Sequence, residues 1–172
     1  MERSLLDIGW FSRWIARTFV PVTSYPDVRD ELSRMGSGAD AVRLAEAVTR
    51  VRRRKLPDPR QIPNAGSFFK NPVVDSASLE RLQAAIGSVP TYPAPAGTKV
   101  SAARLIDACG WRGRRLGRAG VWARQPLVLV NHGGATSADV LALAGAIAED
   151  VGTRFGISLE REPRVIGDQP AR

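Results

Sequence analysis

A single apolar stripe near the C-terminal end is the feature that most narrows the folds open to this chain. Apolar side chains recur there at the spacing of one helical face, within residues 137–155: Val140, Leu143, Ala144, Ile147 and Val151. The spacing predicts one long amphipathic helix, whose apolar face has to be buried against another element. The apolar run PLVLVN, residues 126–131, precedes it and predicts a buried strand.

Helical and extended patterns alternate along the rest of the chain. Three further helices are expected, over residues 40–55, 75–87 and 101–110. Loops are expected over residues 89–97 and 111–120, and one or two short strands over residues 157–167. The alternation predicts the α/β class in its α+β form, a two-layer sandwich of helices on a small mixed sheet.

Charge and residue counts limit the classes of function. The 172 residues hold 25 Lys and Arg against 17 Asp and Glu, a net charge of +8, which predicts an anionic partner such as nucleic acid, a phosphorylated metabolite or an acidic surface. One cysteine, Cys109, and one histidine, His132, exclude an intrachain disulfide and a multi-histidine metal centre, and we expect no metal site. No signal peptide or membrane span is evident, so a cytoplasmic protein without a membrane partner is expected.

The segment NAGSFFKNPVV, residues 64–74, has two interpretations. Ser67 is either a strand-entry serine that satisfies a backbone group or a hydroxyl held in place for chemistry. Glu162 in LEREP would by default be a surface residue of a strand. The basic runs over residues 50–55 and 112–118 are either a solvated charged face or a clamp for phosphate groups.

Four motifs in order point to a known family. KLPDP (55–59), NAGSFFKNPVV, LVLVNHGGAT (127–136) and LEREPRVIG (159–167) resemble the C-terminal part of the UDP-N-acetylenolpyruvoylglucosamine reductase family, also called UDP-N-acetylmuramate dehydrogenase. The resemblance covers roughly Val20 to Gly167. It implies a flavoprotein oxidoreductase of peptidoglycan biosynthesis, in which NADPH reduces FAD and the flavin passes a hydride to the enolpyruvyl double bond of UDP-N-acetylglucosamine enolpyruvate.

The resemblance also implies roles for individual residues. Ser67 falls on the proton donor of the family, and Glu162 on the glutamate that assists at the same reacting group. Family positions that contact the substrate fall on six residues: Lys55, Asn71, Tyr92, Lys99, Arg112 and Gln125. Arg164 falls on an arginine near the flavin. The sequence departs from the family pattern in LEREP, where Arg161 replaces a proline.

The same resemblance gives the expected domain organisation. Residues 1–36 are expected to be a remnant of the preceding flavin and substrate region, residues 37–168 the C-terminal substrate-binding domain, and residues 169–172 a tail. No glycine-rich phosphate loop is found, so the FAD domain is expected to lie outside these residues, and this sequence is expected to be either a split subunit that works with a separate flavin-domain chain or a truncated reading frame. Two alternatives stay open: a UDP-sugar-binding remnant without redox chemistry, and, ranked last, a basic nucleic-acid-binding domain.

Overall fold

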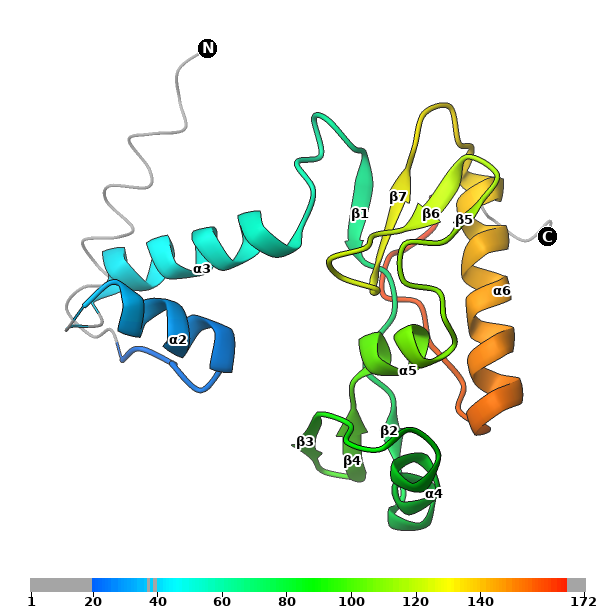
Figure 1. Ribbon diagram of the computed structural model, residues 1–172, viewed down its shortest axis with the longest axis horizontal. Helices are drawn as coiled ribbons and strands as arrows, with labels where there is room; N and C mark the ends of the chain where they lie inside the picture. Colours follow the sequence, from blue (N-terminus) through cyan, green and yellow to red (C-terminus); the bar gives the residue numbers. More distant parts are fainter. Residues whose placement is uncertain (1–19, 37, 39, 167–172) are drawn as a thin grey trace. The chain divides into compact units, whose positions relative to one another are not determined.

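The computed structural model describes residues 20–36, 38 and 40–166 (Figure 1). The chain divides into two compact units, one ending at Lys55 and one beginning at Leu56, so the division falls inside the predicted domain 37–168. Most of the predicted remnant, residues 1–19, and the predicted tail lie outside the described residues. Within the described part of the chain, no helix is both long enough and apolar enough to cross a membrane.

The described residues of the first unit form the helices α2 (Pro26–Arg34) and α3 (Ala41–Lys55). Among these described residues, three apolar side chains are buried: Leu32, Ala47 and Val51. The carboxylate of Glu31 is also buried, and it accepts hydrogen bonds from Arg34 at 3.2 Å and Arg54 at 2.9 Å. These guanidinium groups, Arg54 foremost, lower the pKa of Glu31 and so keep it ionised.

The larger sheet of the second unit has four strands, and every pairing in it is antiparallel. The strands are β1 (Asn64–Ser67), β5 (Arg115–Leu116), β6 (Ala119–Val121) and β7 (Val128–Asn131), in the order β1-β7-β6-β5. β7 confirms the strand predicted from PLVLVN. The loop predicted over residues 111–120 is wrong in part, because β5 and the start of β6 form a hairpin around Gly117, whose φ is +60°.

The smaller sheet has three strands, β2 (Val73–Val74), β3 (Thr91–Ala94) and β4 (Gly97–Val100), in the antiparallel order β2-β4-β3. The loop predicted over residues 89–97 is therefore also wrong in part. Its prolines argued against a strand, but Pro93 lies in the edge strand β3, where the missing N–H removes no ladder bond from the sheet interior.

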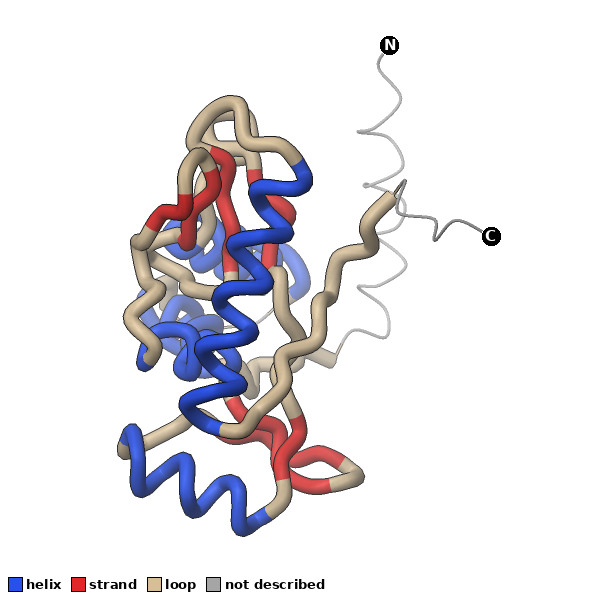
Figure 2. Tube along the Cα trace, turned by 90° about the vertical axis from the view of Figure 1, so that its right-hand side faces the viewer, coloured by secondary structure: helices blue, strands red, loops and turns tan. Residues whose placement is uncertain are grey.

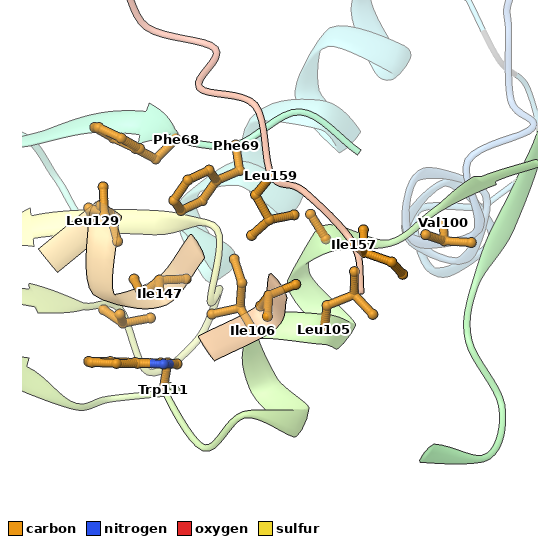
Figure 3. Close-up of a cluster of buried hydrophobic side chains, with 14 of the residues drawn as sticks. Phe68, Phe69, Val100, Leu105, Ile106, Trp111, Leu129, Ile147, Ile157 and Leu159 are labelled. Atoms are coloured by element: carbon orange, nitrogen blue, oxygen red, sulfur yellow. The ribbon is translucent and has the colours of Figure 1, made fainter. Parts of the chain in front are cut away.

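Three helices complete the second unit: α4 (Ser76–Ile86), α5 (Ala102–Ala108) and α6 (Ser137–Phe155). α6, the long helix predicted from the apolar stripe, packs against β6 and β7 (Figure 1). Its buried side chains Leu143 and Ile147 join a core that includes Phe69, Ile106 and Leu129 (Figure 3). The α+β class is confirmed, and the small mixed sheet that was expected is two antiparallel sheets.

The segment that follows α6 is extended and runs back beside the helix (Figure 2). The strands predicted over residues 157–167 reduce to one bridge in the described part of that segment, between Arg161 and Phe69. The apolar residues Ile157 and Leu159 are buried in the core, which accounts for the strand-like alternation in the sequence.

Candidate functional site

Two motifs that lie far apart in the sequence, NAGSFFKNPVV and LEREPRVIG, are paired side by side in the fold. Phe69 and Arg161 form an antiparallel bridge, flanked by two backbone hydrogen bonds. The N–H of Lys70 donates to the carbonyl of Glu160 at 2.9 Å, and the N–H of Glu162 donates to the carbonyl of Phe68 at 2.9 Å. The chain therefore brings Glu162 next to the residue that follows Ser67.

Strand β1 has an irregular backbone just before Ser67, and this irregularity orients the Ser67 side chain. Asn64 pairs with Val130 and Ser67 with Val128, so β1 has one more residue than β7 over this stretch, which is a β-bulge. Gly66 lies in the bulge with φ of +72°, and its N–H donates to Asn64 Oδ1 at 3.1 Å. A bulge turns the following side chain away from the regular alternation, and here that side chain is the exposed Ser67.

A cavity of about 670 Å³ lies beside this pair of segments. Its polar lining residues are Lys70, Asn71, Lys99, Ser158, Glu160 and Glu162. Three of the predicted site residues, Asn71, Lys99 and Glu162, are thus brought together. In the described part of the chain, the side chains of Lys99 and Glu162 make no hydrogen bond or ion pair, so a cation and a carboxylate are both available to a ligand.

Asn71 and Tyr92 connect this cavity to the smaller sheet. Asn71 Oδ1 accepts from the N–H of Ala102 at 2.9 Å, which fixes the motif to the start of α5 and leaves the amide NH₂ for a ligand. Tyr92 pairs with Lys99 across β3 and β4 and is 43% exposed, although it does not line the cavity itself.

Two other predicted substrate contacts are engaged elsewhere in the second unit. Arg112 forms a two-point ion pair with Asp107, at 2.7 and 3.0 Å, and donates to the carbonyl of Ala123 at 2.9 Å. The hydrogen bond from Arg112 lowers the pKa of Asp107. Gln125 is half-buried in the turn before β7, where its backbone carbonyl accepts a hydrogen bond from the N–H of Val128 at 3.0 Å. Neither residue lines the cavity.

Lys55 belongs to the first unit, at the end of α3, where its ammonium group forms an ion pair with Asp27. The N-terminal basic run is therefore at least partly neutralised within its own unit, since Arg50 and Arg54 also contact carboxylates. This arrangement supports the interpretation of that run as a charged face.

The second basic run also contacts its own chain. The guanidinium of Arg114 lies 4.5 Å from the ring centroid of Trp111, and Arg118 donates to the carbonyl of Gly134 at 3.2 Å. Among the described residues, Arg115 forms no ion pair. These contacts favour a solvated charged surface over a preformed phosphate clamp.

Arg164 lines a second, mostly apolar cavity of about 500 Å³, together with Phe68, Val140 and Leu141. The guanidinium of Arg164 and the apolar residues that line this cavity suit a ligand with a flat ring that carries polar atoms at its edge. In the described part of the chain, no three His, Cys, Asp or Glu side chains lie close enough to hold a metal ion.

The side chains of His132 and Cys109 pack against other residues of the second unit. The imidazole of His132 lies directly over Gly120, and burial together with the charge of Arg115 lowers its pKa. Burial raises the pKa of the Cys109 thiol, so the thiolate is disfavoured.

Three polar residues of the cavity that Glu162 lines were not predicted from the sequence: Lys70, Ser158 and Glu160. A signal for one of them was present, because Glu160 and Glu162 alternate in an extended segment and therefore face the same side. Lys70 lies inside the recognised motif, but nothing in the sequence indicates its partner.

Comparison with known proteins decides the family. Residues 58–166 match the family described as UDP-N-acetylenolpyruvoylglucosamine reductase, C-terminal domain. The chain belongs to this family. The resemblance inferred from the four motifs is thereby confirmed.

Two curated relatives agree with this assignment. The UDP-N-acetylenolpyruvoylglucosamine reductases of Burkholderia multivorans and Burkholderia lata are 52% and 53% identical over 153 residues, which is 87% of this chain and 44% of each relative. The chain thus spans less than half the length of these curated relatives. The crystal structure of UDP-N-acetylenolpyruvylglucosamine reductase from Thermus caldophilus is 28% identical, with a TM-score of 0.42, and covers 70% of this chain and 33% of that one.

Proposed function

We propose that this chain supplies the substrate-binding and proton-donating part of a UDP-N-acetylenolpyruvoylglucosamine reductase. The observation that carries the proposal is the backbone pairing of the Ser67 and Glu162 segments beside the cavity lined by Asn71 and Lys99. The substrate is UDP-N-acetylglucosamine enolpyruvate, and the product is UDP-N-acetylmuramate, a precursor of peptidoglycan. The reaction adds a hydride and a proton across the enolpyruvyl double bond.

The cavity provides groups that suit an anionic sugar nucleotide. Lys99 is an exposed ammonium group without an intramolecular partner in the described residues, and such a group binds phosphate or carboxylate oxygens as a point charge. The Asn71 amide NH₂ adds a neutral donor on the same wall. Lys55, Tyr92, Arg112 and Gln125 remain proposed contacts, and of these Lys55 and Arg112 would have to leave their ion pairs with Asp27 and Asp107.

The proton step is assigned to Ser67 and Glu162. After hydride addition, the carbon next to the substrate carboxylate carries negative charge and is strongly basic, so a hydroxyl within hydrogen-bond reach protonates it. Ser67 is exposed beside the bulge at Gly66, and the backbone hydrogen bond from Glu162 to Phe68 holds the backbone of Glu162 next to the residue that follows Ser67. Glu162 then assists at the same reacting group.

FAD and NADPH belong to this proposal through the family. Arg164 and the apolar cavity beside it fit contact with one edge of the flavin ring, and bound FAD would supply the hydride. The described residues include no glycine-rich loop for the pyrophosphate, so the rest of the cofactor would be held by residues outside them, such as a separate flavin-domain chain.

A chimeric enzyme tests the proposal. The matching C-terminal region of the Burkholderia multivorans reductase is replaced by this chain, and NADPH-dependent formation of UDP-N-acetylmuramate is measured. We expect turnover, and a fall of about 10²- to 10⁴-fold in kcat for Ser67→Ala with substrate affinity retained. A folded, flavin-loaded chimera without turnover would overturn the proposal, and substrate binding by that chimera would then favour the non-redox UDP-sugar-binding alternative.

A further inference from the structure

We propose that Lys70 and Glu160 are a positioning pair that holds the C-terminal segment in register with the GSFFKNP motif and so keeps Glu162 in the cavity. Their side chains form an ion pair, and their backbones are joined by the hydrogen bond from the Lys70 N–H to the Glu160 carbonyl. Both residues line the same cavity as Glu162. The pairing rests on the geometry alone, whereas its effect on catalysis rests on the proposed function.

Core packing does not fix the segment beyond Leu159. Leu159 is the last buried residue in the described part of the chain, and the residues after it are exposed or half-buried. The carboxylate of Glu162 has no partner among the described residues that could hold it. Its position therefore depends on the Phe68–Glu162 backbone hydrogen bond and on the contacts of Lys70 with Glu160.

The Lys70–Glu160 ion pair also affects which charges lie near the Glu162 carboxylate. Lys70 is an ammonium group on the same wall as two carboxylates, Glu160 and Glu162. While Glu160 holds Lys70, the Glu162 carboxylate stays free for substrate. Loss of Glu160 leaves Lys70 without a counter-ion next to Glu162, so Glu160→Gln also places a competing cation beside the assisting carboxylate.

Amide hydrogen exchange in the full chain measures the pairing without ligand. In Lys70→Met and in Glu160→Gln, we expect the amides of Lys70 and Glu162 to exchange about threefold faster, because an exposed ion pair contributes modestly. The charge-reversed double variant Lys70→Glu/Glu160→Lys should restore the wild-type rates. Raising the salt concentration from about 0.01 to 1 M should speed exchange in the wild type and have less effect in Lys70→Met.

Two internal references make the result specific. The Val121 and Trp122 amides, which donate within the larger sheet region, should be unchanged in every variant. Glu46→Gln removes the Arg50–Glu46 pair, which is an exposed ion pair of the first unit, and it should leave the Glu162 amide unaffected. Unchanged exchange at Glu162 in Lys70→Met, or no rescue by charge reversal, would overturn the proposal.

The chimeric enzyme separates this inference from the proposed function. Lys70→Met should lower kcat about threefold and leave KM unchanged, with recovery in the charge-reversed variant. Faster exchange with unchanged kcat would support the pairing and overturn the role assigned to Glu162. Unchanged exchange with active chimera would support the proposed function and overturn the positioning pair.

Discussion

Gly66 shows how one residue's backbone conformation determines what its neighbour can do. Its φ of +72° is disfavoured for any residue with a Cβ, and the bulge that needs this conformation sets the direction of Ser67. No atom lies within 4 Å of a Cβ built at this position, so an added methyl group would meet no obstruction. The glycine is required for its conformation and not for space.

Gly66→Ala should therefore lower the free energy of unfolding by about 1–2 kcal/mol, the usual cost of a left-handed conformation for a residue with a Cβ. Gly145→Ala is the matched control, because Gly145 lies within α6 with open space around it, and alanine should stabilise a helix interior by about 0.5–1 kcal/mol. Urea unfolding of both variants measures the difference. A Gly66→Ala variant as stable as the wild type would show that the bulge adopts another conformation in solution.

The Arg112–Asp107 pair gives a residue-scale prediction about pH. The hydrogen bond from Arg112 lowers the pKa of Asp107 in the folded state, so its contribution to stability is complete above the ordinary carboxylate range and is lost as the pH falls through the lowered value. Asp107→Asn should destabilise the chain by up to about 1 kcal/mol at pH 7, since the pair is partly exposed.

Unfolding in urea at pH 7 and near pH 2.5 checks this. The difference between the wild type and Asp107→Asn should shrink at the lower pH, where the carboxyl group is protonated. A difference of the same size at both values would show that Asp107 acts through packing and not through its charge.

At the scale of elements, the sequence predicted what depends on local pattern and missed what depends on pairing. The stripe from Val140 to Val151 predicted α6, because helical spacing is set within the helix itself. The hairpin of β5 and β6 was missed, because arginines and glycines resemble a loop until β7 provides a partner. The segment after Ile157 was predicted to be a strand, since burial of alternate side chains produces the same pattern without a sheet.

In the candidate site, residues within motifs could be predicted from the sequence, and contacts between distant segments could not. Ser67, Asn71, Lys99 and Glu162 were chosen from motifs, and three of them line one cavity. The partner of Lys70 could not be predicted, because it depends on how the C-terminal segment returns to the motif.

Asn71 links the NAGSFFKNPVV motif to the start of α5, and this contact can be tested by substitution. Asn71 Oδ1 accepts from the first N–H of α5, at Ala102, a group that the helix cannot satisfy internally. Asn71→Ala should destabilise the chain by about 1 kcal/mol, whereas Asn71→Asp keeps the acceptor and should be nearly neutral. Chemical unfolding measures both, and equal losses for the two variants would contradict the assigned hydrogen bond.

At the scale of the whole molecule, the main hydrophobic core belongs to the second unit. Every residue of the cluster that contains Phe69, Ile106 and Ile147 lies between Phe68 and Leu159. The proposed substrate cavity is formed entirely by residues of this unit as well.

A fragment of residues 56–172 should therefore fold without the first unit. We expect a cooperative thermal transition and a near-ultraviolet circular dichroism signal from the buried Trp111, which is fixed by a 2.7 Å hydrogen bond to Asp150. A fragment with helical signal but no cooperative transition would show that the first unit is needed for packing.

The proposed function requires the Ser67 and Glu162 segments to form one site for an enolpyruvyl sugar nucleotide. Titration of the isotope-labelled chain with UDP-N-acetylglucosamine enolpyruvate, followed by amide chemical shifts, tests it most directly. We predict saturable shifts at Phe68, Asn71, Lys99 and Glu162, and an affinity about 10- to 100-fold weaker in Lys99→Met, as expected for loss of a charge-assisted contact. Absent shifts, or shifts confined to the basic hairpin of β5 and β6, would show that these segments do not form the substrate site.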